Sequence, residues 1–595
     1  MAEYVGTAFA AVQFADQCIK YGQKLVRRIQ SYRHAEDEVR GLMVTIEHNW
    51  MKTEAQIKFL RNIANKLEPH FRDVQARVLS ELEGKLKTAT LLMDQLIVQE
   101  KEERKKKEAG KKIDIPALSK ALETMAPRKK VKYAFEKNSL ESIRDDLEAW
   151  QRRFDPSWML TMRIADSVVD QQLDQEESKP QQTKFIMAAK GVRDAAREST
   201  TAPIRAEGSI FKPASILSSD ETPIEFSPVL LGQLDGSQET VLIDTMVCNP
   251  IADMDQTMRD VRKLANILSK VDPAEFGLLN CSGVVKSAQI PSREPLRSAI
   301  NLTKPWEPPT FKFLFPIPTS LSTPQSLRAL LIESNPSYPL NGRLDLAKQL
   351  TNSVLFIHSS QFVHKNIRPE TTIIFGKEEN AGTRVLGNLY LVGFEKLRPA
   401  EGMTYRTSDG DWHRDIYRHP SRQGTQPEER YQMQHDIYSL GVVLLELGLW
   451  KSFITYSSSG TISDGAFLEA DGSKKMSESE QAIPVQPDFI AEHSFEKNTL
   501  KRATAIKDHL ISVASQELPA KMGQKYADIV LLCLRCLDKQ PLSIQDNEDE
   551  MGREEWVENE EEEEGEFGDV YDEDGIVVGV KYIEKVLLKM QGISV

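Results

Sequence analysis

Apolar side chains recur at helical spacing through the N-terminal part of the chain, in four stretches. Within each stretch they return every three or four positions, the period of one face of an α-helix. The stripes are Val5, Phe9, Val12, Ala15 and Ile19; Val39, Met43, Ile46, Trp50, Ile57, Leu60, Ala64 and Leu67; Phe71, Val74, Val78, Leu82, Leu86, Ala89, Met93 and Leu96; and Leu140, Ile143, Leu147, Trp150 and Phe154. Each stripe must be buried, so we predict a four-helix bundle over residues 1–178.

The pattern changes after residue 224. Short strand-like runs at 223–232, 239–247, 276–285 and 311–317 surround one helical stretch at 255–271. Helical patterns follow at 327–334, 344–360, 434–450 and 526–537. This order predicts an α+β domain over 224–595, with a small sheet-rich lobe (224–318) and a larger helical lobe (319–595). Residues 179–223, rich in Gln, Ser, Thr, Pro and charge, are predicted to be a linker with one helix near 185–197.

Charge is unevenly distributed along the chain. The net charge is −13, but residues 546–574 alone hold 17 acidic side chains and one Arg, so the rest of the chain is slightly basic. We predict that this run is a disordered acidic insertion. The helix after it, 579–590, is expected to pack on the large lobe through Val580, Ile583, Val586 and Leu587. A basic run at 101–132, with 12 basic and 5 acidic residues, has two interpretations: a segment that can approach anionic lipids, or a solvated loop between helices.

Several classes of protein are disfavoured. No run of about 18 apolar residues occurs, and the N-terminus lacks the basic segment of a secretory signal. Five scattered cysteines indicate a reducing compartment, so we expect a cytoplasmic protein. Cys533 and Cys536 have metal-ligand spacing but lie in an apolar helical pattern, which favours a buried helix face. We expect no metal and no cofactor.

Four motifs in the C-terminal region occur in the order found in protein kinases. FVHKNIRPETTII (362–374) resembles the catalytic loop, LYLVGFEKL (389–397) the strand and metal-binding triplet, YRHPS (417–421) the end of the activation segment, and HDIYSLGVVLLEL (435–447) a long buried helix. FLFPIPTSLSTPQSLRALL (313–331) resembles the strand and hinge between lobes. The resemblance implies a bilobal protein-kinase-like fold, with His364, Phe394 and Asp436 in structural roles. Asp436 would accept hydrogen bonds from catalytic-loop amides.

The departures from the kinase pattern fall on the catalytic groups. Asn366 stands where the catalytic base belongs, Thr371 where a magnesium ligand belongs, and Gly393 where the main metal carboxylate belongs. Glu395 is displaced by two residues from that carboxylate position, and no G-x-G-x-x-G loop precedes it. The strand 240–247 offers Asp244 or Met246 in place of the phosphate-pairing Lys. Because losing a general base alone costs about 10²–10⁴ in rate, we expect a pseudokinase without catalytic residues.

The N-terminal bundle carries a second resemblance. Its apolar first helix and the sequence DLEAWQRRFDPSW (146–158) resemble the HeLo domain of fungal prion-inhibition and propagation proteins. The order of bundle, linker and degenerate kinase resembles the mixed lineage kinase domain-like family, the executioners of necroptosis. That resemblance implies self-oligomerisation and membrane permeabilisation. Residues expected to contact the membrane are Val5, Phe9, Val12, Phe14, Lys105, Lys106 and Lys107.

These features lead us to expect a non-catalytic cell-death effector. A pseudokinase would restrain the bundle until an upstream kinase or receptor-type activator releases it from the cytoplasm to anionic lipids of the plasma membrane. Nucleic-acid binding is not expected, because the basic run has no aromatic residue until Tyr133. Two alternatives remain: a signalling scaffold that binds only proteins, and a kinase with unorthodox metal use.

Overall fold

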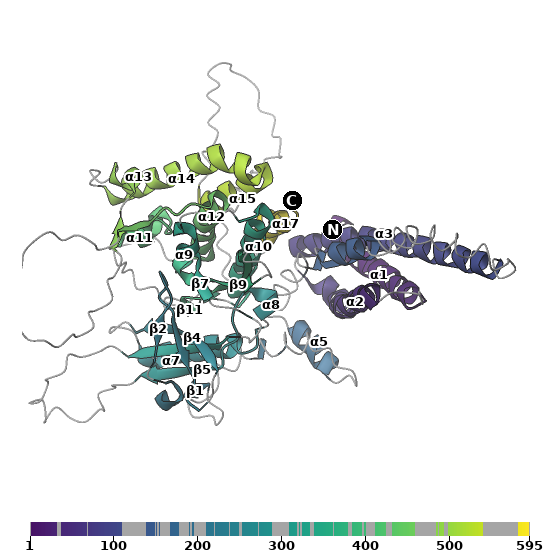
Figure 1. The fold of residues 1–595 in the computed structure, drawn as a ribbon, viewed down its shortest axis with the longest axis horizontal. Helices are drawn as coiled ribbons and strands as arrows, with labels where there is room; N and C mark the ends of the chain where they lie inside the picture. The colour runs from purple at the N-terminus through teal and green to yellow at the C-terminus, as the bar shows by residue number, and fades with distance from the viewer. Residues whose placement is uncertain are drawn as a thin grey trace, which may run out of the picture. The chain divides into compact units, whose positions relative to one another are not determined.

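The structure is a computed structural model, and its chain divides into two compact units (Figure 1). It describes residues 2–31, 37–67, 69–109, 138–154, 167–177, 190–194, 210–248, 253–287, 309–333, 338–378, 384–399, 411–423, 431–457, 483–492, 498–538 and 581–593, with short gaps inside some of these ranges. One unit comprises Met1–Asp194 and Tyr582–Gly592, and the other Ala195–Lys581 and Ile593–Val595. The chain is therefore multidomain, as predicted.

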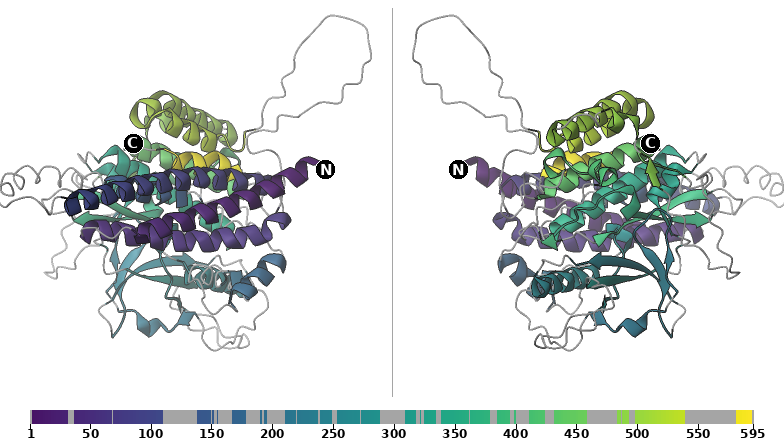
Figure 2. Two further views of the ribbon diagram at one scale, coloured as in Figure 1. Left: turned by 90° about the vertical axis from the view of Figure 1, so that its right-hand side faces the viewer. Right: turned by 90° about the vertical axis from the view of Figure 1, so that its left-hand side faces the viewer.

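The N-terminal unit is helical. Its elements are α1 (Ala2–Ser31), α2 (Asp37–Ile63), η1 (Ala64–Lys66), α3 (Pro69–Ala109), a helix over 138–148, and α5 (Ser167–Glu177). Helix α1 packs along α3 and also contacts α2, and the helices run side by side in Figure 2. The second, third and fourth predicted stripes are buried at nearly all described positions, which confirms these three helices and their core faces.

The fourth helix closes the bundle by contacts with both α2 and α3. Trp150, just beyond residues 138–148, is buried and donates its indole N–H to the carbonyl oxygen of Val78 in α3 at 2.9 Å. The same ring stacks on Phe154 with centroids 4.6 Å apart. The amide of Asn49 in α2 reaches Glu148 at 3.4 Å. These contacts explain why the apolar stripe of residues 140–154 faces inward.

Helix α1 lies on α2 at a glycine. A Cβ atom built on Gly22 would fall 1.9 Å from the indole ring of Trp50, so only glycine permits this approach. The buried face of α1 is also rotated from the predicted stripe, because Ala11, Ala15 and Cys18 are buried whereas Val12 is only half-buried. Small side chains let the neighbouring helices approach this face closely.

Four boundaries differ from those predicted. Helix α3 continues to Ala109, so the first part of the basic run is helical and not a loop. Residues 190–194 belong to the N-terminal unit, and they are paired with α5 by Lys190–Asp174 at 2.8 Å and by Arg193 with Asp170.

The last helix, η8 (Ile583–Leu587) with α17 (Leu588–Gln591), is buried as expected, but it groups with the N-terminal unit instead of the large lobe. In the predicted linker, β1 (Phe211–Lys212) and β2 (Thr222–Pro223) are strands. Val580, the acidic run 546–574 and most of 179–209 lie outside the described residues.

The C-terminal unit contains a mixed six-stranded sheet with strand order β1-β5-β6-β4-β3-β2. Its other strands are β3 (Leu230–Gln233), β4 (Thr240–Val247), β5 (Gly283–Ser287) and β6 (Thr310–Pro316). Only the pairing of β1 with β5 is parallel among these neighbours. Helix α7 (Met254–Leu268) follows β4, and Asp253 caps it by accepting from two backbone N–H groups. Each of the four predicted strand runs overlaps one of β3 to β6.

The rest of this unit is mainly helical. Its helices are α8 (Pro273–Phe276), α9 (Leu327–Ile332), α10 (Leu340–Ser359), α11 (Trp412–Asp415), α12 (Met433–Leu449), α13 (Asp488–Ala491), α14 (Thr499–Met522) and α15 (Gln524–Leu534). Smaller sheets are formed by β7 (Pro324–Ser326), β9 (Thr372–Glu378) and β10 (Arg384–Leu391), by β8 (Phe362–Val363) and β11 (Arg398–Pro399), and by β12 (Thr455–Ser457) and β13 (Ile483–Val485). All 17 residues of α12 are buried, and α10, α14 and α15 pack against it. Helix α14 was not predicted.

Candidate functional site

The backbone of the segment after β8 donates hydrogen bonds to one buried carboxylate. Asp436 in the first turn of α12 accepts the backbone N–H of His364 at 2.7 Å and that of Lys365 at 2.9 Å. The hydroxyl of Tyr431 donates to the same carboxylate at 2.7 Å, and His358 Nε2 lies 3.0 Å from it. The contact that we expected of Asp436 is therefore present. Lys365 adopts a positive φ of 64°, a conformation that these hydrogen bonds hold in place.

Electrostatics in this cluster follow from burial. Burial alone would raise the pKa of Asp436, but hydrogen bonds from His358 and Tyr431 hold it below its ordinary value. Burial lowers the pKa of His364 to about 4, in spite of the nearby Asp436 charge. His364 is therefore neutral near pH 7, and its Nδ1 accepts the backbone N–H of Asn366 at 3.3 Å. These buried groups stabilise the conformation of the loop.

Asn366, which the kinase resemblance places at the position of the catalytic base, forms hydrogen bonds inside the protein. Its side-chain oxygen accepts from Arg368 Nε at 2.9 Å, and its side-chain nitrogen donates to the carbonyl oxygen of Gly393 at 3.3 Å. Thr371 is fully buried, and its hydroxyl lies 2.6 Å from the carbonyl oxygen of Asn366 and 3.0 Å from that of Arg368. Both side chains therefore form hydrogen bonds with other groups of the same loop or with Gly393.

Gly393, which the kinase resemblance places at the position of the main metal ligand, is sterically fixed. Its φ is 88°, and a Cβ atom there would lie 2.3 Å from Thr371 Cγ2 and 3.2 Å from Asn366 Nδ2. A carboxylate cannot be restored at residue 393 without moving Thr371. Three of the four residues predicted at degenerate positions, Asn366, Thr371 and Gly393, are thus brought together and pack on one another.

Asp244 is the residue of β4 that reaches this cluster. Its carboxylate is buried, and one oxygen lies 2.8 Å from the backbone nitrogens of both Gly393 and Phe394. Met246, the other residue considered for this position, is half-buried. The ring of Phe394 packs against Phe315 of β6 at a centroid distance of 6.0 Å. A carboxylate therefore lies where the kinase resemblance implies a phosphate-pairing Lys.

A buried ion cluster lies beside the same loop. Arg328 of α9 is fully buried and pairs with Glu370 at 3.1 Å and with Glu446 at 2.8 Å. Tyr417 donates to Glu446 at 2.7 Å, and Tyr456 donates to Glu370 at 3.3 Å. Arg328, Arg368, Tyr431 and His358 were not predicted as residues of the site. The Arg at position 2 of an otherwise apolar helix, LRALLI, was the available signal for Arg328.

The predicted membrane-contacting residues are placed only in part. Val12 and Phe14 are half-buried and pack on a small cluster of Ala11, Ala64 and Ala76. Residues 5 and 9 lie in α1 and residues 105–107 in α3, but their side chains are outside the described set, as is Glu395. In the described part of the chain, no helix is long and apolar enough to cross a bilayer.

No group of three or more His, Cys, Asp or Glu residues suited to a metal ion occurs among the described residues. Cys533 and Cys536 are buried, and burial raises the pKa of Cys536 to about 12, so this thiol stays protonated. The Cys536 thiol contacts the carbonyl oxygen of Gln434 at 3.3 Å. Both cysteines lie in the interior of the C-terminal unit, as predicted from the apolar pattern.

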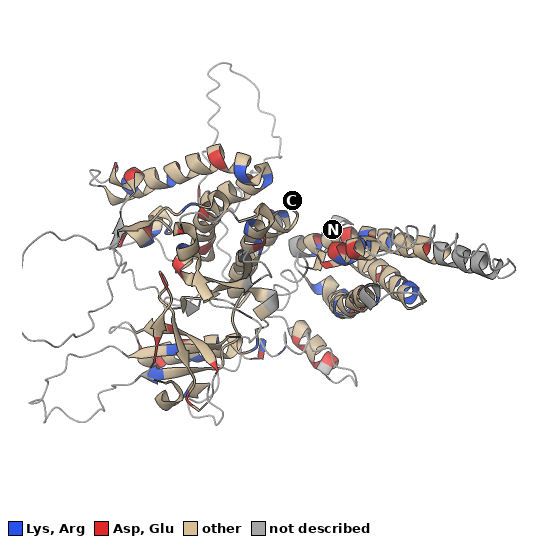
Figure 3. Ribbon diagram, in the orientation of Figure 1, with Lys and Arg blue, Asp and Glu red and all other residues tan. Residues whose placement is uncertain are grey.

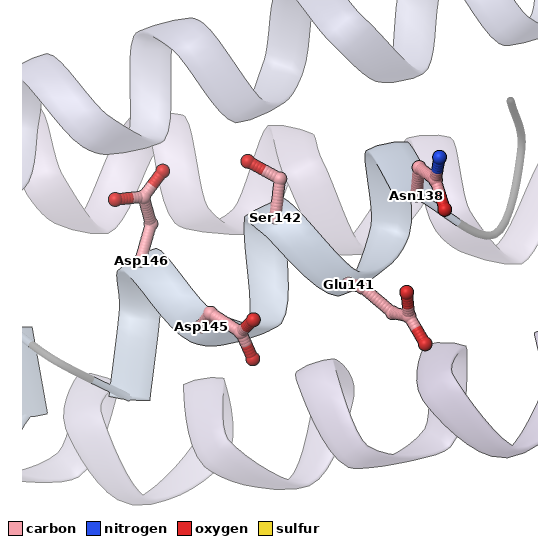
Figure 4. A pocket seen from close by; sticks show the side chains of 5 residues that line it. All are labelled: Asn138, Glu141, Ser142, Asp145 and Asp146. Atoms are coloured by element: carbon pink, nitrogen blue, oxygen red, sulfur yellow. The ribbon is translucent and has the colours of Figure 1, made fainter. Parts of the chain in front are cut away.

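An open hollow of about 540 Å³ lies on the N-terminal unit, lined by Asn138, Glu141, Ser142, Asp145 and Asp146 (Figure 4). All five residues come from one helix, with Glu141 and Asp145 on its opposite side from Ser142 and Asp146. Lys85 pairs with Asp146 at 2.9 Å and Arg144 with Asp145 at 2.6 Å. Charges of both signs occur on the described helices of each unit (Figure 3). We interpret the hollow as a solvated helix face.

The chain matches no protein-family model and no curated protein with which it was compared. Any assignment of function must therefore rest on its own residues. The described cluster around Asn366 and Gly393 is closed and hydrogen-bonded internally, and it can position backbone but offers no exposed nucleophile or base.

Proposed function

We propose that the chain is a non-catalytic effector whose C-terminal unit is a protein-kinase-like pseudokinase. The observation that carries this proposal is the internal use of the degenerate positions, since Asn366, Thr371 and Gly393 bond to or pack on one another. Phosphoryl transfer depends on cations that neutralise phosphate charge and on a residue that positions the nucleophile. Asp244 adds a negative charge where positive charge is needed.

The N-terminal unit is proposed to be a HeLo-like bundle that permeabilises membranes. Helix α1 supports this role because it joins a core of small side chains and leaves Val12 and Phe14 half-buried. Close small-residue packing can be exchanged for another surface at lower cost than a core of large interlocking side chains. The basic residues near the end of α3 would attract anionic headgroups, each contributing about 1 kcal/mol near the surface.

In the resting protein the pseudokinase holds the bundle silent in the cytoplasm. Modification of the C-terminal unit by an upstream kinase, or binding of a receptor-type activator, would release the bundle. Released copies would oligomerise at the plasma membrane and damage it. No cofactor is needed for this sequence of events, because every step is binding or rearrangement.

Leakage of dye from vesicles tests the proposal. Residues 1–194 expressed together with residues 582–592, which belong to the same unit, and checked by circular dichroism, should release dye from vesicles that contain anionic lipid, and the full chain should release much less. Changing Lys105–Lys107 to Glu in the full chain should lower its affinity for these vesicles at least tenfold at low salt. A charge-matched control changes Lys501, Lys521 and Lys525, which are exposed on α14 and α15, in the full chain. Folded fragments that leave anionic vesicles intact would contradict the membrane mechanism.

A signalling scaffold is the second candidate, and one observation favours it. Val44 and Met51 on α2, and Leu91 and Val98 on α3, are more than half exposed. The members of each pair are seven residues apart and so lie on one face of their helix. If the bundle binds proteins only, Met51→Lys should abolish partner binding, while vesicles stay intact with either protein. Phosphate transfer from ATP with several divalent metals, lost in a variant of Asn366, would instead support an unorthodox kinase.

A further inference from the structure

The carboxylate of Asp244 occupies a small anion site made of backbone. One of its oxygens lies 2.8 Å from the nitrogen of Gly393 and 2.8 Å from that of Phe394. Two successive N–H groups that converge on one atom form an anion-binding concavity. The positive φ of Gly393, 88°, gives the backbone its turn at this point. Asp244 is only 2% exposed, so the pair is shielded from water.

The same segment is fixed to the six-stranded sheet by its aromatic ring. Phe394 lies 6.4 Å from Phe313 and 6.0 Å from Phe315, both of β6, measured between ring centroids. The ring of His364 is 5.4 Å from that of Phe394. Asp244 lies opposite Phe313 in the register of β4 with β6. Polar and apolar contacts therefore tie one short segment after β10 to two neighbouring strands.

We propose that Asp244 is a built-in occupant of this anion site that closes it to phosphoryl groups. A phosphate oxygen would need the same two N–H donors that the carboxylate already uses. A phosphoryl group beside Asp244 would also meet like charge in a place screened weakly by water. The C-terminal unit therefore excludes nucleoside phosphates through Asp244 itself, in addition to lacking catalytic groups.

This inference does not depend on what the helical bundle does. It concerns only residues of the C-terminal unit, and it would hold for a scaffold as well as for a membrane effector. It also assigns Asp244 a second effect, because the carboxylate joins β4 to the segment after β10. Removing the carboxylate should both open the anion site and loosen that segment.

The test uses the full chain with Asp244→Ala and Asp244→Asn, and with Asp235→Ala as a control on an exposed turn beside the same strand. Thermal melting is recorded alone, with sodium formate, with inorganic phosphate, and with ADP or ATP with and without magnesium. We expect Asp244→Ala to melt about 3–10 °C lower than the unaltered protein. Formate or phosphate should restore part of that loss, while the unaltered chain and the Asp235 variant respond to neither.

Hydrogen exchange gives a readout if the alanine variant does not fold. The amides of Gly393 and Phe394 should exchange at least tenfold faster in Asp244→Asn than in Asp235→Ala. Equal exchange would overturn the proposal. So would stabilisation of the unaltered protein by ADP or ATP to the same extent as the Asp244 variants, or an Asp244→Ala variant that melts like the unaltered protein.

Discussion

Replacing Asp436 by alanine removes an acceptor on which four donors converge. The backbone N–H groups of His364 and Lys365, the hydroxyl of Tyr431 and the ring of His358 lie 2.7, 2.9, 2.7 and 3.0 Å from its oxygens. A buried donor left without an acceptor costs about 1–3 kcal/mol. Removing the buried charge returns part of this cost, because its desolvation no longer opposes folding. We therefore expect the unfolding free energy of the C-terminal unit to fall by about 3–6 kcal/mol.

Differential scanning calorimetry of the full chain measures the effect, because two units should give separable transitions. Asp436→Asn keeps one acceptor oxygen but turns an N–H₂ group toward the donors, so its loss should be smaller than that of alanine. Asp528→Ala on α15 is the control, since Asp528 is exposed and its one described partner is Gln524 at 2.8 Å. That change should stay within about 0.5 kcal/mol.

Two results would refute this reasoning about Asp436. The first is an alanine variant whose transitions match those of the Asp528 control. The second is a shift confined to the transition of the N-terminal unit. Either would mean that the loop after β8 is not held by α12 in the way described.

The remaining predictions concern one histidine and two glycines. His364 has a pKa of about 4 in the folded protein and an ordinary value of 6.5, so the unfolded chain takes up a proton first as the pH falls. The free energy of unfolding should therefore fall by about 2 kcal/mol between pH 7 and pH 5. In His364→Gln, the midpoint urea concentration should change less over this pH range. Gly393→Asp should lower the free energy of unfolding by about 2–5 kcal/mol, because it adds backbone strain and overpacking. Gly236 also has a positive φ but is surrounded by open space, so Gly236→Asp should add only the strain. Similar decreases in melting temperature for the two variants would contradict the crowding at Gly393. Gly22→Ala should destabilise the N-terminal unit by about 1–3 kcal/mol or more. Gly84→Ala, on an open helix surface, should instead stabilise it by about 0.5–1 kcal/mol. Urea unfolding shows whether each variant is less or more stable than the unaltered protein.

Much of the fold followed from periodicity, because long amphipathic helices leave a repeating signal. The stripe of Leu140, Ile143, Leu147 and Trp150 is buried throughout. Helix α14 was not predicted, because its buried positions include Ala503, Lys507 and Ala514 as well as larger apolar residues. The apolar periodicity of its sequence is therefore weak. The short strands β1 and β2 are two residues each, too short to show any alternation.

The candidate site was predictable as a set of positions but not as a set of contacts. Motif spacing brought Asn366, Thr371 and Gly393 together correctly. The direction of Asp244 depends on the register of β4 with β6 and on the φ of Gly393, and neither is encoded in local sequence. Arg368 likewise could not be linked to Asn366 from spacing alone, because side chains two residues apart face each other only in particular loop conformations.

The grouping of Tyr582–Gly592 with the first 194 residues has a consequence for synthesis. The ribosome must translate residues 195–581 before this segment emerges. At about 5–20 residues per second that takes roughly 20–80 s. During this interval the nascent N-terminal unit lacks the C-terminal segment that groups with it, in which Ile583, Val586 and Leu587 are buried. The helices made first are thus completed last, and chaperones have a defined period in which to bind them.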